Sequence, residues 1–181
     1  RVFGSPLVSP QNEQTVFRPD SLYGISKTAA AAFVRMYREK EGLFSCSGIL
    51  YNHESPRRDP FFLPRKITMA AARIKLGLEK ELRLGDLNAR RDWGFAGDYA
   101  EAMWLMLQAD EPEDYVIGTG VTHSVKDILD IAFGEVGLDW KKYVASNSTL
   151  VGRAEPRPIV ADISKITKNI GWQPKTKFEE L

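Results

Sequence analysis

Cysteine is almost absent from this chain of 181 residues, in which Cys46 is the only one. One cysteine excludes a disulfide within the chain and favours a reducing compartment, so we expect a cytoplasmic protein. No apolar run approaches the roughly 20 residues that a membrane-spanning helix needs. The formal net charge is only +1, which gives no electrostatic case for a nucleic-acid or membrane partner.

A glycine-rich cofactor motif is missing as well. The chain has neither a Gly-x-x-Gly-x-x-Gly string nor the ribose-selecting residue that follows it; such a turn seats a dinucleotide pyrophosphate on a helix N-terminus. The chain begins at Arg1 and stops at Phe178-Glu-Glu-Leu181, where a helix is expected to open. We therefore expect a fragment of a longer protein.

What is present predicts a globular α/β domain. The chain is 43% hydrophobic and 27% charged, and predicted helices and strands alternate, which favours a sheet with a parallel component. Helices are expected after Asp20 up to Gly42, from about Pro64, from Asp98, after the capping box Ser124–Asp127, and over 162–170; strands are expected over 44–51, 82–84 and 115–117. Cys46 is expected to be a small buried residue of the strand at 44–51.

Two of these helices have a clear apolar stripe at helical spacing. In the first, the residues expected to be buried are Ala29, Ala30, Phe33, Val34 and Tyr37. In the second, they are Ile67, Ala70, Ala71 and Ile74.

Tyr23 and Lys27 lie four residues apart at the start of the first predicted helix, so their side chains share one face. A nearby ammonium favours the phenolate and lowers the pKa of a tyrosine from about 10. Such a tyrosine can take a proton from a hydroxyl while a hydride leaves the same carbon, and the ammonium can bind a cofactor ribose. Because this spacing also arises by chance on solvated helices, a surface pair is the alternative.

A polar segment, Asn52-His-Glu-Ser-Pro-Arg-Arg58, follows the predicted strand at 44–51 directly. In open α/β sheets, ligands bind at loops beyond the carboxyl ends of strands. Arg57 or Arg58 can fork onto a phosphate, whereas the alternative is a solvated surface loop. His53 is not expected to bind a metal, because the only other histidine, His123, has no ligand spacing around it.

Two further arginine clusters are Arg90-Arg-Asp-Trp-Gly94 and Arg153-Ala-Glu-Pro-Arg157. Three separate arginine sites in a chain of near-zero net charge indicate local anion binding, with a pyrophosphate as a common target. Each cluster by itself also fits an exposed arginine.

Together these motifs resemble the GDP-mannose 4,6-dehydratases, a branch of the extended short-chain dehydrogenase/reductase family. The resemblance runs from the Tyr23–Lys27 pair through Asn52–Arg58 and Arg90–Gly94 to Ala161-Asp-Ile-Ser-Lys165 and Gly171-Trp-Gln-Pro174. It thus covers nearly the whole chain, and the Asn52–Arg58 string is specific to that branch. It implies a partial Rossmann-like fold with the C-terminal substrate-binding part.

By this resemblance, residues 1–52 are the second part of a dinucleotide-binding domain whose N-terminal part is absent. Residues 53–181 are mostly the substrate-binding part, while 82–117 contribute strands and a helix back to the Rossmann-like domain. The cofactor implied is NADP and the substrate is a nucleotide sugar, GDP-mannose. We also expect a homo-oligomer for the full-length parent.

The resemblance also assigns roles to individual residues. Tyr23 matches the catalytic base, and Lys27 the residue that lowers its pKa and holds the nicotinamide ribose. His53 and Arg58 match NADP-contacting positions. The positions that match substrate-binding residues are Asn52, Lys66, Arg91, Arg153 and Glu155.

The implied reaction converts GDP-mannose to GDP-4-keto-6-deoxymannose, a net elimination of water. The position of the family's acid/base glutamate is occupied by Arg1, and this slightly favours the runner-up, a sugar-nucleotide 4-epimerase or 4-reductase. A third hypothesis is a non-catalytic binding or assembly remnant, because the cofactor motif is missing. We expect the fragment to be inactive alone.

Overall fold

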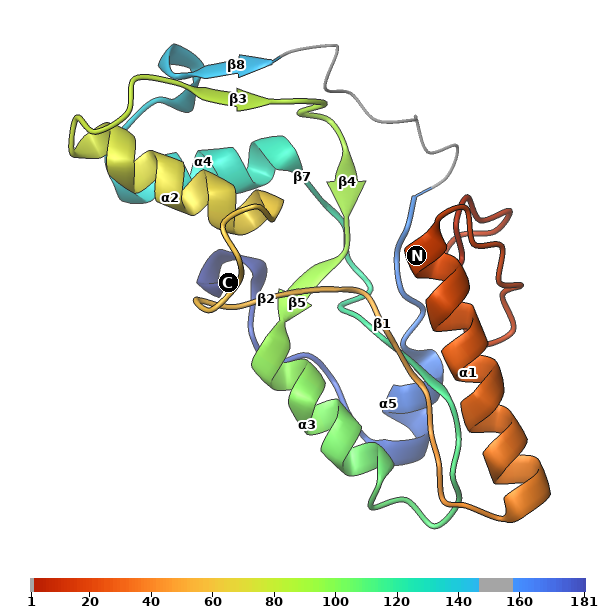
Figure 1. The fold of residues 1–181 in the computed structure, drawn as a ribbon. Coiled ribbons are helices and arrows are strands. Elements are labelled where there is room, and N and C mark those ends of the chain that lie inside the picture. The colour runs from red at the N-terminus through yellow and green to blue at the C-terminus, as the bar shows by residue number, and fades with distance from the viewer. Residues whose placement is uncertain (1, 147–157) are drawn as a thin grey trace. The chain divides into compact units, whose positions relative to one another are not determined.

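The computed structural model describes residues 2–146 and 158–181, which form two compact units. Unit 1 comprises Arg1–His53, Asp92–Thr122 and Glu155–Leu181, and unit 2 comprises Glu54–Arg91 and His123–Ala154. Helices and strands alternate along the chain (Figure 1). The predicted segment 82–117 is divided between the units after Arg91, and the roles predicted for the parts stay predictions.

Unit 1 is built on a pair of parallel strands, β1 (Gly48–Leu50) and β6 (Tyr115–Ile117). The register places Gly48 opposite Tyr115 and Leu50 opposite Ile117. The other elements of this unit are α1 (Leu22–Glu41), β5 (Trp93–Phe95), α3 (Ala96–Met106), α5 (Ser164–Ile170) and the 3₁₀ turn η3 (Phe178–Glu180). The chain leaves the unit at β2 (Asn52–Glu54).

Alternation along β6 gives unit 1 a core on each face of the strand pair. Tyr115 and Ile117 pack on one face with residues of α3 and α5, among them Tyr99 and Ile166. Val116 packs on the other face in a cluster that includes Phe3, Tyr51 and Ala161. Successive strand residues point to opposite faces, so the three residues of β6 serve both clusters.

The strand predicted over 44–51 is shorter than expected, because side chains satisfy the backbone before β1. Arg38 donates from Nη1 to the carbonyl of Ser45 at 2.9 Å, and Asp114 accepts from the amide of Ser47 at 2.8 Å. Cys46 is therefore outside the strand and half-buried rather than buried. Burial raises the pKa of its thiol.

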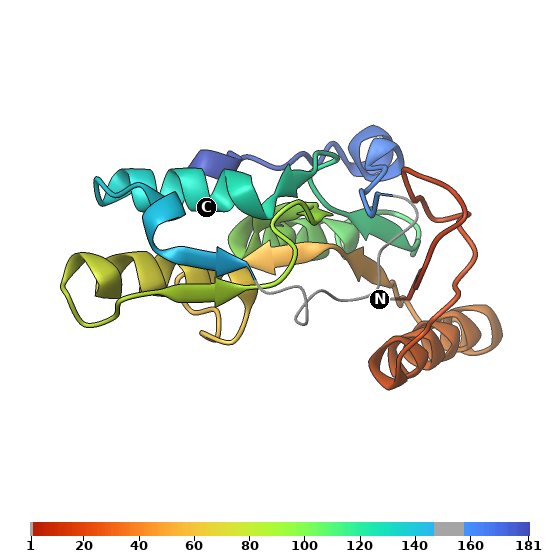
Figure 2. The ribbon, with the colours of Figure 1, turned by 90° about the horizontal axis from the view of Figure 1, so that it is seen from above.

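Unit 2 pairs a helical layer with short strands. Its helices are α2 (Leu63–Lys75), α4 (Val125–Glu135) and the 3₁₀ turn η1 (Trp140–Lys142); its strands are β3 (Leu82–Leu84), β4 (Arg90–Arg91), β7 (His123–Ser124) and β8 (Val144–Ser146). β3 and β8 run parallel and lie side by side in Figures 1 and 2, while β4 and β7 are antiparallel. The parallel component predicted from the sequence is confirmed in both units.

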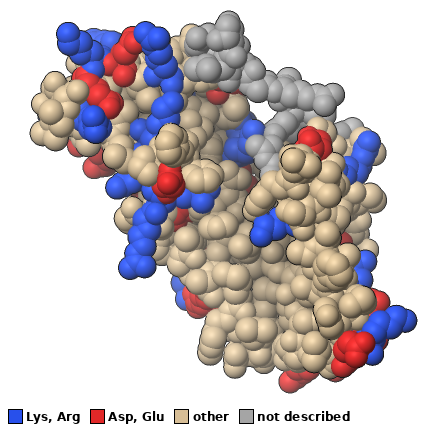
Figure 3. Space-filling model, in the orientation of Figure 1, with Lys and Arg blue, Asp and Glu red and all other residues tan. Residues whose placement is uncertain are grey.

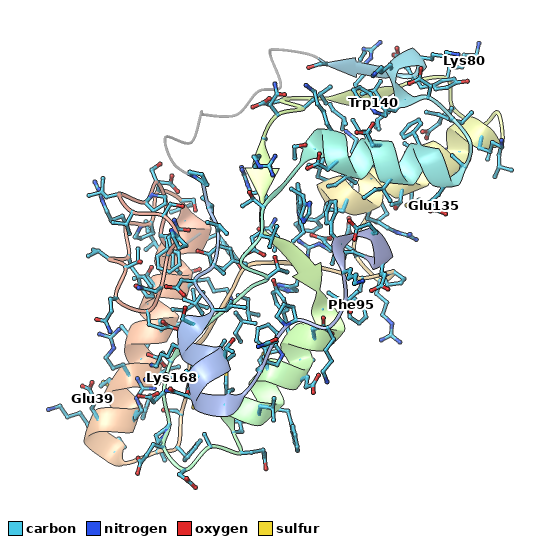
Figure 4. All side chains as sticks on the ribbon, turned by 180° about the vertical axis from the view of Figure 1, so that it is seen from behind. Glu39, Lys80, Phe95, Glu135, Trp140 and Lys168 are labelled. Carbon is cyan, nitrogen blue, oxygen red and sulfur yellow. The ribbon has the colours of Figure 1, made fainter. Side chains whose placement is uncertain are left out.

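The two helices of unit 2 pack against each other. α2 begins with Pro64 in its first turn, and all four predicted core residues, Ile67, Ala70, Ala71 and Ile74, are buried. α4 begins at the predicted capping box, in which Ser124 and Asp127 each accept the other's backbone N–H. The indole of Trp140, labelled in Figure 4, donates to Asp130 at 2.6 Å and so holds η1 to α4.

The first helix contradicts the prediction about its apolar stripe. α1 has the predicted ends, with Ser21 as N-cap and Gly42 in the left-handed region at φ 64°. However, the side chain of Val34 is only partly buried, and the other stripe residues, Ala29, Ala30, Phe33 and Tyr37, are exposed. In Figure 3 the charged side chains on the visible part of this helix gather towards its C-terminal end. The stripe is therefore an apolar face left uncovered by the described part of the chain.

α1 is attached to its own unit through a charged pair near its C-terminal end. The Arg38 guanidinium donates to both carboxylate oxygens of Asp114, at 2.8 and 3.0 Å. Burial opposes ionisation of Asp114, but the hydrogen bonds from Arg38 and Ser47 hold the pKa of that carboxyl below its usual range. The sequence predicted that α1 would be attached by apolar packing, whereas the structure attaches it by polar contacts at one end.

Within residues 2–146 and 158–181, none of the helices has the length and apolar character needed to span a lipid bilayer.

Candidate functional site

Tyr23 and Lys27 lie in the first two turns of α1, at the end of the helix that Ser21 caps. The Ser21 hydroxyl accepts from the amide of Gly24 at 3.1 Å, which fixes the start of the helix. The Lys27 ammonium lies 5.6 Å from the centre of the Tyr23 ring. The Tyr23 side chain is 61% exposed, so its hydroxyl is available to a ligand.

Asn52 and His53 belong to β2, at the carboxyl end of the β1 segment. His53 Nδ1 lies 2.9 Å from the carbonyl oxygen of Tyr51. Because a carbonyl only accepts, Nδ1 carries the proton, and Nε2 of a neutral ring is an acceptor. Asn52 is exposed.

Tyr99 supports this pair and was not predicted as a functional residue. It is almost fully buried on α3, with its ring 5.4 Å from that of His53. Its hydroxyl donates to the carbonyl oxygen of Asn52 at 3.4 Å. Tyr99 therefore supports both the backbone and the imidazole of the predicted binding segment. The only sequence signal for this role is its position on the predicted helix, directly after Asp98.

Asp92 is a second residue whose role sequence reasoning missed, although it lies inside the Arg90–Gly94 motif. It is 1% exposed and accepts from Thr119 N and Oγ1, Gly120 N and Ala161 N, at 2.8 to 3.1 Å. Burial raises its pKa, and these hydrogen bonds offset part of the rise. One carboxylate thus joins three chain segments of unit 1.

Gly118 shows how closely these segments approach each other. A Cβ added there would lie 2.4 Å from Cβ of Ala161 and 2.9 Å from Oδ2 of Asp92. Such distances exclude any side chain without movement of the backbone. The segment after β6 is therefore packed against Ala161 with no room to spare.

Three predicted residues, Arg58, Lys66 and Arg91, lie in unit 2. Arg58 forms an ion pair with the buried Glu54, with 3.2 Å between Nε and Oε2. Lys66, in the first turns of α2, is exposed and donates from Nζ to the carbonyl of Arg83 at 3.0 Å.

Arg91 lies on β4, where it pairs with His123 of β7. Its Nη1 donates to the carbonyl of Arg90 at 2.6 Å. The carboxylate of Asp127 lies 4.0 Å from both Arg90 and His123. Burial opposes ionisation of Asp127, but hydrogen bonds from Ser124 and these two neighbours hold its pKa below the usual range.

The predicted residues therefore fall into three groups in the structure. Unit 1 brings Tyr23 close to Lys27 and holds Asn52 with His53, whereas unit 2 carries Arg58, Lys66 and Arg91. Arg153 and Glu155 lie outside the described residues, as do Arg1 and most of the predicted loop at 147–158. Residues 2–146 and 158–181 contain no group of three or more potential metal ligands. The roles predicted for these residues stay predictions.

Comparison with known proteins gives one consistent result. The family model described as GDP-mannose 4,6 dehydratase matches residues 1–181. GDP-mannose 4,6 dehydratase 1 of Arabidopsis thaliana is 51% identical over 180 residues, which are 99% of this chain and 50% of that protein. GDP-mannose 4,6 dehydratase of Homo sapiens is 41% identical over 200 residues, covering 99% of this chain and 53% of its own length. The chain spans about half the length of these curated relatives.

Solved structures show the same fold. RMD from Pseudomonas aeruginosa, complexed with NADPH, superposes with a TM-score of 0.91 at 21% identity, over 99% of this chain and 60% of its own. The dTDP-glucose 4,6-dehydratase of Bacillus anthracis, in complex with NAD, gives a TM-score of 0.84 at 22% identity, over 99% and 55%. The predicted fold class, an α/β partial Rossmann-like fold of the extended short-chain dehydrogenase/reductase type, is confirmed.

Proposed function

The chain belongs to the GDP-mannose 4,6 dehydratase family, and from this premise we propose that the protein containing it is a sugar-nucleotide dehydratase. It converts GDP-mannose to GDP-4-keto-6-deoxymannose and water, with NADP as the cofactor. The observation that carries the proposal is the Tyr23–Lys27 pair, whose groups lie together on an accessible face of α1. We propose a homo-oligomer for the full-length protein.

The residues present fit a nicotinamide cofactor. The Lys27 ammonium suits ribose hydroxyls, and the Arg58 guanidinium, which has no hydrogen bond from its terminal nitrogens within the described residues, suits a phosphate. Nε2 of the half-buried His53 ring offers an acceptor to a hydroxyl or amide. A bound nicotinamide would supply the hydride chemistry of the reaction, as an acceptor for the hydride of C4 and a donor to C6.

In the proposed mechanism, Tyr23 accepts the proton of the C4 hydroxyl as the hydride leaves. Lys27 favours this step because its charge stabilises the phenolate over the phenol. The 4-keto group that results acidifies the proton at C5, so this proton and the C6 hydroxyl leave together as water. C5 then regains a proton, which balances the one that Tyr23 accepted. Arg91 and Asn52 hold the diphosphate and hexose while these steps occur.

Turnover of GDP-mannose by a full-length protein that contains this chain tests the proposal. We expect a 4-keto-6-deoxy product, formed with loss of one water and without net consumption of NADPH. A protein that makes no such product, but consumes stoichiometric NADPH on a 4-keto sugar, would instead be a 4-reductase. Isothermal titration with GDP, UDP and dTDP identifies the nucleotide base that the protein prefers. The predicted diphosphate-binding residues do not distinguish one base from another.

A further inference from the structure

Arg58 is held by an unusual buried partner. Glu54, at the end of β2, is only 4% exposed, and its Oε2 lies 3.2 Å from Nε of Arg58. Both atoms are shielded from water, yet they lack the alignment of a hydrogen bond, and no other group within residues 2–146 and 158–181 bonds to them. Burial raises the pKa of Glu54, and the charge of Arg58 offsets part of this rise. The pair is therefore a constraint on the direction of the guanidinium more than a source of stability.

One face of the guanidinium plane is covered by an aromatic ring. The central carbon of the Arg58 guanidinium lies 3.4 Å from the centre of the Phe62 ring, in a cation–π contact. Phe62 itself is 47% exposed, so the ring forms part of the surface. Neighbouring Phe61 is 95% exposed and makes no such contact in the described chain.

Two consecutive turns place these groups. In Ser55–Arg58 and Asp59–Phe62, the first carbonyl accepts from the last amide at 2.9 and 3.0 Å, with proline at the second position of each turn. The side chains of Ser55 and Asp59 also accept from the third amide of their own turns. The backbone between Glu54 and α2 is thus fixed by the sequence itself.

This geometry leaves one edge of the guanidinium unused. Nε faces Glu54 and the plane rests on Phe62, whereas Nη1 and Nη2 make no hydrogen bond to the residues that the structure describes. Two parallel N–H groups on a fixed plane match two oxygens of a phosphate. We infer that Glu54 and Phe62 are positioning residues, which hold Arg58 so that its terminal nitrogens meet a phosphate group of the cofactor; this rests on the proposed function.

We call the arrangement in which Glu54 and Phe62 hold the Arg58 guanidinium the clamp. Side-chain dynamics of the 181-residue chain test whether it exists, without any ligand. The ¹⁵N–¹H NOE at Nε of Arg58 should report an ordered group, whereas that of Arg57, which is exposed on the same turn, should report a mobile one. Glu54→Gln and Phe62→Leu should both mobilise Arg58 Nε, and Phe61→Leu should leave it ordered. If Arg58 is as mobile as Arg57 in the unaltered chain, no clamp exists and the inference is wrong.

Titration with inorganic pyrophosphate tests what the clamp is for. Phe62→Leu leaves the charge of the site unaltered, so it isolates positioning, and we expect affinity to fall about two- to tenfold, with no change for Phe61→Leu. Arg58→Ala should lower it about tenfold or more, and Arg57→Ala, which removes the same charge, by less than about twofold. For Glu54→Gln only the NOE at Arg58 Nε is interpreted. Removal of the negative charge by itself raises the affinity of the site for an anion, so the pyrophosphate affinity of this variant does not isolate positioning.

Two outcomes overturn the inference at this stage. Equal affinities for Phe62→Leu and Phe61→Leu would mean that the ring does not position Arg58, and an Arg58 signal that pyrophosphate leaves unmoved would mean that no phosphate binds there. Thermal unfolding of each variant shows whether a lost affinity is merely lost folding. None of these measurements depends on turnover. A negative result here therefore does not contradict the proposed dehydratase reaction, and a negative turnover result does not contradict the clamp.

Discussion

The helices α1 and α2 have the same kind of apolar stripe in the sequence but differ in the structure. Ile67 of α2 is fully buried, and α2 packs against α4. Phe33 of α1 is 61% exposed, and α1 is attached through the Arg38–Asp114 pair instead. Helical spacing shows which face of a helix can be buried, but burial itself requires another surface to cover that face.

The two helices also differ in the side chains they present. α1 carries Tyr23 and Lys27, the residues to which we assign chemistry, on accessible turns. α2 gives its apolar face to the core of unit 2 and follows the turns that fix Arg58. Substitutions on α1 are therefore expected to change activity, and those on the apolar face of α2 to change stability.

The largest effect is expected for Tyr23→Phe in a full-length protein that contains this chain. Loss of a general base lowers a rate by about 10²- to 10⁴-fold, whereas loss of one exposed hydroxyl leaves packing intact. The measurement is kcat for GDP-mannose together with Tm. Tyr37→Phe, on the same helix and 46% exposed, is the matched control. A Tyr23→Phe protein within a fewfold of wild type would make Tyr23 a structural residue.

Ile67→Ala in the 181-residue chain should lower the free energy of unfolding by about 2–5 kcal/mol, because it leaves a cavity between α2 and α4. Phe33→Ala on α1 deletes a larger side chain but should cost less than about 0.5 kcal/mol, since that ring is mostly exposed. Urea unfolding of both variants measures the difference. Comparable losses would show that the face of α1 is covered in solution.

Arg91→Ala tests whether this residue of unit 2 contributes to binding of the substrate diphosphate rather than to the chemical step. A diphosphate contact made equally in the ground state and the transition state raises KM and leaves kcat nearly unchanged. We expect a loss of about 1.5–3 kcal/mol in kcat/KM, almost all of it in KM. Arg83→Ala removes an exposed arginine of β3 and is the control. An unaltered KM would place the diphosphate elsewhere.

The smallest effect concerns the attachment of α1. The folded-state pKa of Asp114 is lowered, so its stabilisation is present above the ordinary pKa near ~3.9 and is lost as pH falls through the folded value. Asp114→Asn should cost about 1 kcal/mol at pH 7, because water still reaches the pair. Urea unfolding from pH 7 to pH 3 should show this difference closing. A gap that stays constant with pH would mean that the carboxylate charge does not hold α1.

Much of the candidate site could be predicted because its signals are local. The spacing of Tyr23 and Lys27 places both groups on one helix face, and the proline turns between Glu54 and Phe62 follow from residue type. The buried supports could not be predicted in the same way. Tyr99 reaches the Asn52 carbonyl, and Asp92 accepts from the segments at Thr119 and Ala161, across separations that no local pattern records.

The sequence by itself determined the places of the helices and of three strands, the caps at Ser21, Gly42 and Ser124, the presence of parallel pairing and the family, because these depend on neighbouring residues or on motifs along the chain. It did not predict the short strands β2, β4, β5, β7 and β8. Tertiary structure decided which apolar faces are buried and which polar groups are held in place. The stripe of α1 is exposed while that of α2 is buried, and Glu54 is enclosed beside Arg58. Burial is a property of what surrounds a side chain, and that surrounding comes from segments distant in sequence.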